Sequence, residues 1–450
     1  MQKNRRSFLQ QLGLAGAGLL AGSSTALAKG HTQQEQPISR QEPMPFDGTL
    51  IRLGLIGAGG MGVEDTKTAL QHAGVTLTAV ADLYKGRLDA AKATWGNQLF
   101  TTTDYKALLN RPDVDAVIIG TPDHWHMPIS VDALKAGKHV YCEKPMLHKV
   151  SEGQALLEAW QKSGKVMVVG SQGLSSLGNE KAKELLAAGA IGDLVYAEGF
   201  WARMSPEGAW QYKIPADGNA QTVDWARYER EKKHAFDPLR FFRWRNYLDY
   251  GTGMSGDLFV HLFSSLHFIT NSLGPTKIAA MGGLRYWKDG REVPDVLLGM
   301  FDYPQTNAHP GFNLSLRCNF VDGTSGTTYL RLAGTKGSMD VEWEKVTVRL
   351  NANAETDDPF LKAQAASNAP AVESRKKMVP PRETVYKAEA GYKGAHYDHF
   401  GNWFTAIRTG GKVVEDPLFG FRACAPALLC NDSYFEKKYI LWDPVNLRLG

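Results

Sequence analysis

The sequence predicts an α/β protein with a doubly wound parallel sheet, followed by an α+β domain with an open, mostly antiparallel sheet. Up to about residue 172, short apolar runs alternate with helical stretches, which is the pattern of strand–helix–strand units. From about residue 173, strand-like runs follow one another with few helices between them. The chain has 450 residues, 43% of them hydrophobic and 22% charged. This composition is that of a folded protein of two or three domains.

The first 28 residues are typical of an export signal. Arg5 and Arg6 precede a Gly/Ala-rich apolar stretch, and Ala26-Leu27-Ala28 offers a small-residue cleavage site. The paired arginines and the weak hydrophobicity resemble a twin-arginine signal, with an ordinary secretory signal or a buried first helix as alternatives. We therefore expect a periplasmic or exported protein that uses the twin-arginine route, with residues 29–48 as a linker.

The charge balance favours a small-molecule partner. The net charge of +4 falls to +1 without residues 1–28, and no basic patch remains that would indicate nucleic-acid binding. After residue 30 there is no apolar run of the length of a transmembrane helix. The four cysteines are too few for a disulfide-built fold, and Cys424 and Cys430 are too far apart to pair if they share a helix. We expect free thiols.

A glycine-rich loop follows the first apolar run of the parallel-sheet region. Residues 50–56 end at Gly57, which begins a G-x-G-x-x-G pattern, and the next apolar run ends at Asp82, 20 residues after the pattern. In this context the glycines permit a tight turn, close approach of a pyrophosphate and helix–strand packing, while the acid binds a ribose diol. A carboxylate would repel a 2′-phosphate, so we expect NAD rather than NADP. The predicted NAD-binding Rossmann domain spans residues 49–172, and the loop and strand-end residues expected at the cofactor are Gly57, Gly59, Gly60, Met61, Gly62 and Asp82.

Glu143-Lys144-Pro145 lies at the end of another predicted parallel strand. Ligands bind such sheets at the carboxyl ends of their strands, so Lys144 is placed to bond a substrate hydroxyl and stabilise the alkoxide formed from it. The alternative is a surface lysine in a strand-to-helix loop.

Asp257 and His261 form a second candidate pair. Ser255 could cap a helix that begins there, and residues four apart on a helix face the same way. His261 would accept a proton, and Asp257 would orient it or bind a neighbouring sugar hydroxyl. The simpler alternative is an acidic first-turn residue and a core histidine.

Aromatic and guanidinium side chains concentrate on either side of the long segment before this helix. Such groups suit sugar rings, although the edge of a core or an interface would explain them as well. The candidate substrate-binding residues are Trp201, Arg203, Arg243, Trp244 and Arg245.

Taken together, these motifs resemble the glucose–fructose oxidoreductase / inositol dehydrogenase (Gfo/Idh/MocA) family over about residues 50–345. The resemblance rests on the glycine loop, Asp82, the segment Thr121-Pro122-Asp123-His124-Trp125-His126, Glu143-Lys144-Pro145 and the Asp257/His261 pair. The C-terminal helical segments resemble the exported branch of the family. The resemblance implies a Rossmann domain followed by an open-faced sheet domain, here residues 173–450, and an NAD(P)-dependent oxidoreductase of sugars or polyols. It also implies that Lys144 and His261 transfer protons with the help of Asp257, and that Thr121, Pro122, His126, Glu143 and Gln172 line the cofactor. An open sheet commonly pairs between subunits, so we expect a homodimer or homotetramer.

Three functions share these motifs. The first is a dehydrogenase that releases a keto-sugar, and the second is an NAD-dependent glycosidase, which oxidises, eliminates, hydrates and reduces the same sugar. Lys144 favours the dehydrogenase, because the glycosidase branch often lacks that lysine. The third is a catalytically silent sugar-binding module, against which the intact Lys144, Asp257 and His261 argue. Because free NAD should be scarce outside the cytoplasm, we expect the cofactor to be tightly bound and recycled in place. Two histidine–aspartate groups, Asp123/His124/His126 and His396/Asp398/His399, are better explained without a metal.

Overall fold

The computed structural model describes residues 34–39, 46–323, 328–351 and 382–450. The predicted export signal and part of the predicted linker lie outside the described residues. Five residues of that linker form a strand, β1 (Gln34–Ile38), which pairs in parallel with β15 (Arg382–Ala388) at the edge of the larger sheet. Both segments are mostly polar, and each buries one apolar side chain, Ile38 and Val385. Edge pairing together with this limited burial accounts for the two strands.

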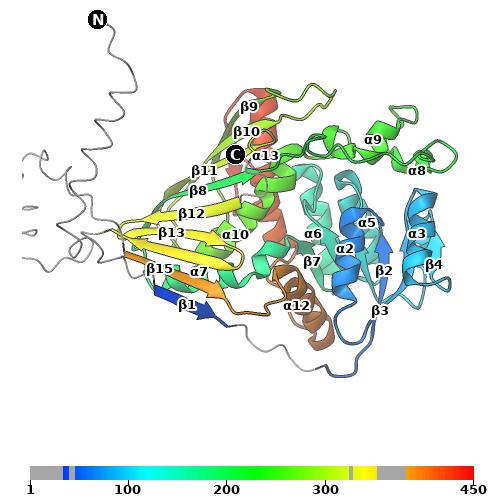
Figure 1. Cartoon of the computed structure of the whole chain (residues 1–450), viewed down its shortest axis with the longest axis horizontal. Coiled ribbons are helices and arrows are strands. Elements are labelled where there is room, and N and C mark those ends of the chain that lie inside the picture. The colour runs from blue at the N-terminus through cyan, green and yellow to red at the C-terminus, as the bar shows by residue number, and fades with distance from the viewer. Residues whose placement is uncertain (1–33, 40–45, 324–327, 352–381) are drawn as a thin grey trace, which may run out of the picture.

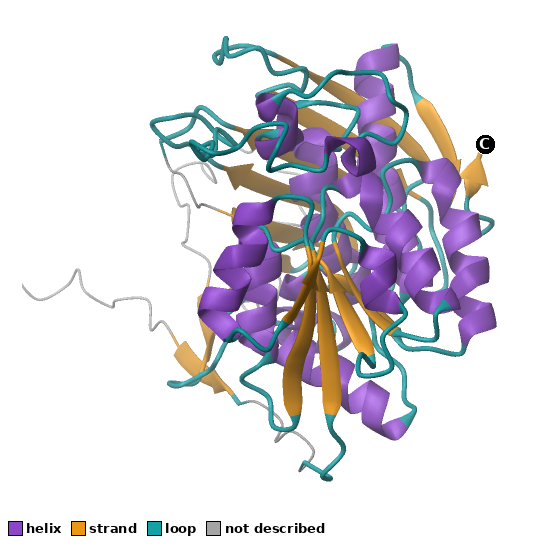
Figure 2. Ribbon diagram, turned by 90° about the vertical axis from the view of Figure 1, so that its right-hand side faces the viewer, coloured by secondary structure: helices purple, strands orange, loops and turns teal. Residues whose placement is uncertain are grey.

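The first domain is a six-stranded parallel sheet in the order β4-β3-β2-β5-β6-β7, which confirms the predicted doubly wound fold. Its strands are β2 (Ile51–Ile56), β3 (Val75–Ala81), β4 (Phe100–Thr102), β5 (Ala116–Ile119), β6 (His139–Glu143) and β7 (Met167–Gly170). The helices that connect them are α2 (Gly60–Ala69), α3 (Lys85–Trp95), α4 (Tyr105–Leu109), α5 (His126–Lys135) and α6 (Gly153–Ser163). Figure 2 shows helices on both sides of this sheet. The strand order reverses between β2 and β5, which is where such sheets bind ligands.

The second domain contains an eleven-stranded sheet, in the order β1-β15-β14-β13-β12-β8-β11-β10-β9-β16-β17. Its pairs are antiparallel except β1 with β15 and β8 with β11, so the predicted open, mostly antiparallel sheet is confirmed. The remaining strands are β8 (Leu194–Ala202), β9 (Lys277–Gly283), β10 (Val296–Tyr303), β11 (Phe312–Asn319), β12 (Thr328–Gly334), β13 (Gly337–Glu342), β14 (Lys345–Leu350), β16 (Ile440–Asp443) and β17 (Arg448–Leu449).

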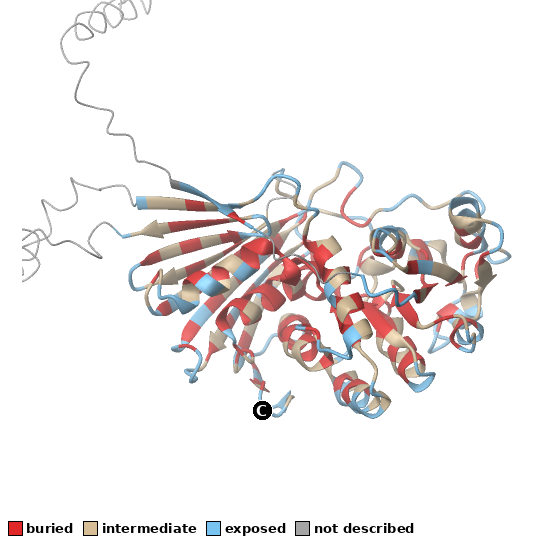
Figure 3. Ribbon diagram, turned by 90° about the horizontal axis from the view of Figure 1, so that it is seen from below, coloured by how far each residue is buried: buried red, intermediate tan, exposed pale blue. Residues whose placement is uncertain are grey.

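Helices cover one face of this sheet and leave the other open (Figure 3). The covering helices are α7 (Leu177–Ala187), α10 (Val260–Thr270) and α13 (Pro417–Glu436). Strand residues alternate between the two faces, as in β10, whose buried Leu297 is followed by exposed Leu298. On the open face Met281 is 77% exposed and Met300 67%. A stretch of exposed apolar side chains on a sheet face is typical of an interface.

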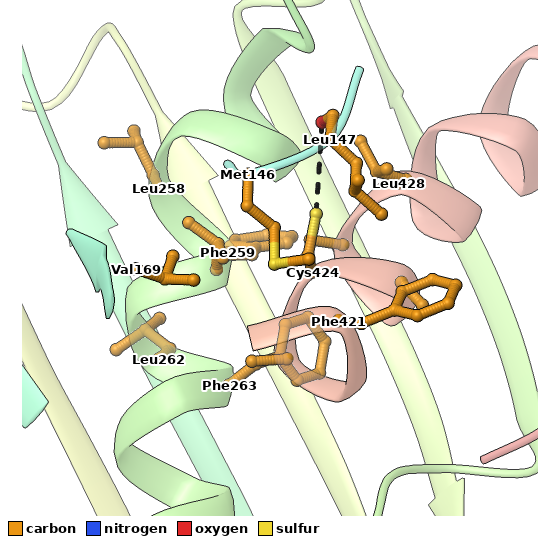
Figure 4. Close-up of a cluster of buried hydrophobic side chains, with 14 of the residues drawn as sticks. Met146, Leu147, Val169, Leu258, Phe259, Leu262, Phe263, Phe421, Cys424 and Leu428 are labelled. Atoms are coloured by element: carbon orange, nitrogen blue, oxygen red, sulfur yellow. Dashed lines mark hydrogen bonds between the residues drawn. The ribbon is translucent and has the colours of Figure 1, made fainter. Parts of the chain in front are cut away.

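The C-terminal helices join the two domains. Helix α12 (Ala395–Thr409) packs against α2 of the first domain, and its Phe400 and Trp403 belong to the same buried cluster as strand β2. Helix α13 contacts both α6 and α10, so its buried face bridges the domains (Figure 1). Figure 4 shows part of this shared core, which contains Met146, Phe259 and Phe421.

All four cysteines are buried and free, as predicted. Among the helices of the described residues, none combines the length and apolar character needed to cross a bilayer.

Candidate active site between the two domains

A cavity of about 1310 Å³ opens at the carboxyl ends of the parallel strands, between the two domains. The first domain contributes the glycine loop and the segments that follow β3, β5 and β6. The second domain contributes the end of β8, the segment before α10 and the hairpin between β13 and β14. Cavities at this edge of a doubly wound sheet are the usual place for a dinucleotide and its substrate.

The glycine loop has the close contacts that a dinucleotide site requires. A Cβ on Gly57 would lie 2.7 Å from the backbone of Gly120, and one on Gly62 would lie 2.1 Å from the Gly57 carbonyl oxygen. By contrast, a Cβ on Gly60 would meet nothing within 4 Å, so the start of helix α2 is open to the cavity. The loop is therefore tight on its inner side and accessible on its outer side, which fits a pyrophosphate at the helix N-terminus. Gly62 packs beneath Gly57 and is not among the residues lining the cavity.

Asp82 lines the cavity beside this loop, and its carboxylate is already bonded to protein. It accepts hydrogen bonds from the backbone N–H groups of Ala58 (2.8 Å) and Tyr84 (2.9 Å). Arg87 approaches the same carboxylate at 3.5 Å. A carboxylate can accept further bonds, so the ribose role remains open to Asp82. Arg87, which was not among the predicted site residues, adds a cation to the cavity lining beside Asp82.

The strand-end loops after β5 and β6 are held together by His126. Its imidazole lies between the carbonyl oxygens of Pro145 (2.7 Å) and Thr121 (2.8 Å). Burial lowers the pKa of His126 to about 4. The neutral ring has a single N–H, so it donates to one of these carbonyl oxygens and packs against the other, which places it between the two loops. Pro122 lines the cavity. The hydroxyl of Thr121 is buried and has no hydrogen-bond partner among the described residues, which leaves it free for a ligand.

Lys144 and Asp257 meet across the domain interface. The Lys144 ammonium donates to Asp257 Oδ1 (2.8 Å) and to the Asp257 carbonyl oxygen (3.0 Å). Arg245 Nε donates to the same carboxylate oxygen at 3.2 Å. Burial opposes ionisation, but the Lys144 ammonium and the Arg245 guanidinium hold the pKa of the Asp257 carboxyl well below its usual range. The carboxylate is therefore ionised and fixes the ammonium in place.

Asp257 lies on a π-helical turn, Ser255–Phe259, that leads directly into α10. Ser255 was expected to cap this helix, but it does not. Its hydroxyl instead donates to the Ala427 carbonyl oxygen of α13 (2.7 Å). The turn is anchored by packing: Leu258 and Phe259 lie in the same core as Met146 and Leu147, which follow Lys144-Pro145 (Figure 4). This apolar contact sets the distance between the lysine and the aspartate.

His261 lines the cavity next to this ion pair, with its ring 5.3 Å from Trp201. Burial and the nearby Lys144 ammonium lower the pKa of His261 to about 3, so the imidazole is neutral. Its Nδ1 has no hydrogen-bond partner within the described part of the chain. Asp257 therefore does not orient His261 by a hydrogen bond, which was one of the two roles expected of it, because its bonds go to Lys144 and Arg245.

Glu143 and Gln172 form the polar floor of the cavity. Gln172 Nε2 donates to Glu143 Oε1 (2.5 Å), and burial together with the Asp65 carboxyl raises the pKa of Glu143 to about 8. Asp65, on helix α2, is fully buried and bonds His396 of α12 at 2.8 Å. His396 also lines the cavity, so the C-terminal helix contributes to the site.

Four of the five predicted substrate-binding residues line the cavity: Trp201, Arg203, Trp244 and Arg245. Arg243 does not, because its guanidinium turns away and donates to the Tyr212 carbonyl oxygen (2.9 Å) and to Gln211 (2.6 Å). It lies at the junction between α9 (Pro238–Phe242) and the 3-10 helix Trp244–Asn246, where these two hydrogen bonds hold it away from the cavity.

Several lining residues were not found from the sequence. Trp343 lies in the β13–β14 hairpin and reaches over Gly173, where a Cβ would be 2.4 Å from its indole. His396 was considered only as one of a group of possible metal ligands. Within the described residues no cluster of three or more His, Cys, Asp or Glu side chains could hold a metal ion. A single tryptophan in a hairpin has no pattern that would have predicted its place.

The second domain also closes over the first. The segment between β8 and α10 contains α8 (Trp225–Tyr228) and α9 (Pro238–Phe242), which extend over the first domain (Figure 1). Tyr84 pairs with Val223 in an antiparallel bridge, and its hydroxyl donates to Asp217 (2.5 Å). A separate apolar cluster, which includes Tyr84 and Phe242, lies beneath this segment. The residues next to Asp82 are thus covered by the second domain.

Comparison with known proteins identifies the family. The model of the oxidoreductase family with an NAD-binding Rossmann fold (GFO_IDH_MocA) matches residues 51–171, and the GFO/IDH/MocA C-terminal domain model matches residues 179–340. An alpha-N-acetylgalactosaminidase from Shewanella oneidensis is 28% identical over 244 residues, which are 51% of this chain and 51% of the relative. An inositol 2-dehydrogenase from Salmonella paratyphi B is 33% identical over 169 residues, which are 37% of this chain and 49% of the relative. The chain spans about half the length of the curated relatives it matches.

Solved structures share the fold. A levoglucosan dehydrogenase in complex with NADH and levoglucosan superposes with a TM-score of 0.63 at 18% identity, covering 87% of this chain and 99% of that one. An aldose-aldose oxidoreductase from Caulobacter crescentus complexed with glycerol gives 0.63 at 16% identity over 87% and 99% of the two chains. With the two family models covering most of the chain between residues 51 and 340, the protein belongs to the Gfo/Idh/MocA oxidoreductase family and has its NAD-binding Rossmann domain.

Proposed function

We propose that the protein is an NAD-dependent oxidoreductase that oxidises a hydroxyl group of a sugar or glycoside. The proposal rests on one observation: Lys144, Asp257 and His261 meet in the cavity that also contains the dinucleotide loop. When bound, the nicotinamide supplies the hydride acceptor. The protein must then hold the substrate hydroxyl, remove its proton and exclude water.

The site contains groups for each task. The Lys144 ammonium has three donors and uses two on Asp257, so one remains for the substrate oxygen, where it stabilises developing negative charge. The neutral imidazole of His261 can accept the hydroxyl proton through an unprotonated ring nitrogen. Asp257 holds the ammonium in position and offsets the positive charge that His261 gains. Trp201 and Trp343 restrict water from the side of the second domain.

We further propose that NAD stays bound through turnover and that the chain is exported. The segment over Tyr84 and Asp82 supports slow cofactor release, because its bridge to Val223 must open first. The paired Arg5 and Arg6 support export by the twin-arginine route, which carries folded proteins. A bound nicotinamide outside the cytoplasm requires a second substrate that takes the hydride back at the same site.

The glycosidase function is the second candidate, and the similarity to an alpha-N-acetylgalactosaminidase favours it. Both functions begin with the same oxidation. They differ afterwards, because a glycosidase must expel an aglycone and restore the hydroxyl group.

Product analysis without added NAD distinguishes the two. As an oxidoreductase, the purified protein should give a burst of bound NADH of about one per chain with a single glycoside, and a keto-sugar acceptor should restore turnover. A glycosidase should release aglycone continuously without an acceptor. Keto-sugar formation that depends on added free NAD would contradict the bound-cofactor proposal, and the absence of any NADH or product across a broad glycoside panel would contradict the function itself.

Export is tested separately by changing Arg5 and Arg6 to lysine. The variant should accumulate as full-length precursor in the cytoplasm. Normal export in cells that lack the twin-arginine pathway would refute this part of the proposal.

A further inference from the structure

The substrate end of the cavity has more cations than carboxylates. The charged side chains of the lining residues that act on His261 or Arg245 are Lys144, Arg203, Arg245, Asp123 and Asp257. Burial raises the pKa of Glu143 to about 8, so this nearby acid is mostly neutral at pH 7. Three cations face two carboxylates, so one positive charge remains uncompensated beside Lys144 and His261.

Arg203 is the first cation with free donors. Its side chain is 47% exposed, and its ion pair with Asp257 Oδ2 is long, at 3.9 Å. Lys144 and Arg245 already occupy the other oxygen of that carboxylate at 2.8 and 3.2 Å. The Arg203 guanidinium thus faces the cavity with no short hydrogen bond to a side chain among the described residues.

Arg245 is the second cation and is well oriented. Its Nε is bonded to Asp257, and its guanidinium lies over the Trp244 ring at 4.2 Å. These two contacts fix the plane of the group. Its terminal amino groups have no hydrogen-bond partner in the described part of the chain, so they can bind an acceptor. A planar, fixed guanidinium matches the geometry of a carboxylate.

These cations are separate from those beside the dinucleotide loop. Arg203 and Arg245 contact Asp257, next to Lys144, whereas the glycine loop adjoins Arg87, whose guanidinium carbon would be 3.8 Å from a Cβ on Gly59. The phosphates of a bound dinucleotide would therefore lie near Arg87 and would not neutralise the positive charge of Arg203 and Arg245.

We propose that the substrate is a sugar acid, a sugar or glycoside with a carboxylate that Arg203 and Arg245 bind while Lys144 and His261 act on a ring hydroxyl. The proposal rests on the oxidoreductase function and names its substrate class. Aromatic side chains surround the same space and supply faces for the sugar ring: Trp201, Tyr212, Trp244 and Trp343. Lys213 adds a further positive charge at the cavity.

The test compares matched acidic and neutral sugars. The probes are methyl glucuronide and methyl galacturonide, their uncharged methyl esters, and the corresponding methyl glucoside and galactoside. Two quantities are measured for each: binding by calorimetry to the protein as purified, and kcat/KM for the oxidation. Arg203→Gln removes the proposed contact, and Arg448→Gln, at a residue with a 74% exposed side chain near the C-terminus, is the matched control.

We expect at least one uronide to bind and react more than tenfold better than its ester and its neutral parent. Arg203→Gln should reduce that preference by roughly 10- to 100-fold, as for a lost hydrogen bond to a charged group, and should weaken uronide binding in the calorimeter. Arg448→Gln should change neither quantity, and raising the salt concentration should weaken uronide binding alone.

The outcomes separate the two proposals. Neutral sugars that react as well as the uronides, or an Arg203→Gln variant that lowers both classes equally, would overturn the sugar-acid proposal and leave the oxidoreductase function intact. Uronides that bind in an Arg203-dependent way, while neither they nor the neutral sugars are oxidised, would support the carboxylate site and contradict the oxidoreductase function. Failure of every uronide to bind would overturn the sugar-acid proposal.

Discussion

The Asp257 carboxylate pairs with three cations, Lys144, Arg203 and Arg245. Removing Asp257 should therefore lower the free energy of unfolding more than removing Lys144. In Lys144→Met, the buried carboxylate keeps Arg245 at 3.2 Å and Arg203 at 3.9 Å. It remains paired, and we expect a loss of about 1 kcal/mol in the free energy of unfolding, in the range of an ordinary substitution. In Asp257→Asn, Lys144 and Arg245 lose their shared carboxylate and repel each other in a buried site, and breaking a buried pair in this way costs about 3–5 kcal/mol.

Chemical denaturation followed by tryptophan fluorescence measures this difference, and Lys144→Met should be the more stable variant by about 2 kcal/mol or more. Its turnover should nevertheless fall by roughly 10²–10⁴, because the hydrogen-bond donor that stabilises the developing alkoxide is lost. A Lys144→Met variant that unfolds as easily as Asp257→Asn would refute the claim that the carboxylate is shared. Unchanged turnover would refute the role of the lysine.

Other predictions follow from single contacts. Burial raises the pKa of Glu415 to about 8, so between pH 4.5 and 8 the folded chain keeps a proton that the unfolded chain has lost. The free energy of unfolding therefore falls by about 1.4 kcal/mol for each unit of rising pH in that window. Glu415→Gln should flatten this loss of stability between pH 5 and 8 in denaturation curves. Gly62→Ala should abolish NAD binding, because the added Cβ would lie 2.1 Å from the Gly57 carbonyl oxygen. The nucleotide content of the purified protein measures this, and a normal content would show that the loop can move to accept the Cβ. Met281→Lys with Met300→Lys should convert the proposed dimer or tetramer to monomers in sedimentation experiments if the open sheet face is the interface, and an unchanged assembly would place the interface elsewhere.

The glycine loop and the residues at the strand ends could be predicted because their signals are local. Gly57 follows a buried strand, Asp82 ends the next one, and Glu143-Lys144 ends another, so the rule that parallel strands end at one edge brings them together. The cavity contains all three. Asp257 and His261, expected to share a helix face, both line this cavity, although Asp257 lies on a π-helical turn.

The remaining features depend on tertiary contacts. Strand β4 has three residues and helix α4 has five, so neither is long enough for its periodicity to be visible. The bond between Ser255 and Ala427 depends on α13 packing against the turn, and a residue 172 positions away leaves no mark on the local pattern. His396 reaches the cavity because α12 returns to the first domain, a tertiary contact that the local sequence does not reveal.

Transfer of deuterium from substrate to cofactor tests the central claim most directly. The protein as purified is mixed with a glycoside that has deuterium on every ring carbon, in ordinary water and with no added NAD. The nicotinamide nucleotide is then extracted, and its mass is measured by mass spectrometry. Our account predicts that one deuterium is found on the nucleotide in wild-type protein and that the label is lost in a Lys144→Met, His261→Ala double variant that retains its nucleotide. Unlabelled nucleotide together with a product that has lost a ring deuterium to water would contradict it, because the carbon–hydrogen bond would then be broken by proton removal and not by transfer to the nicotinamide.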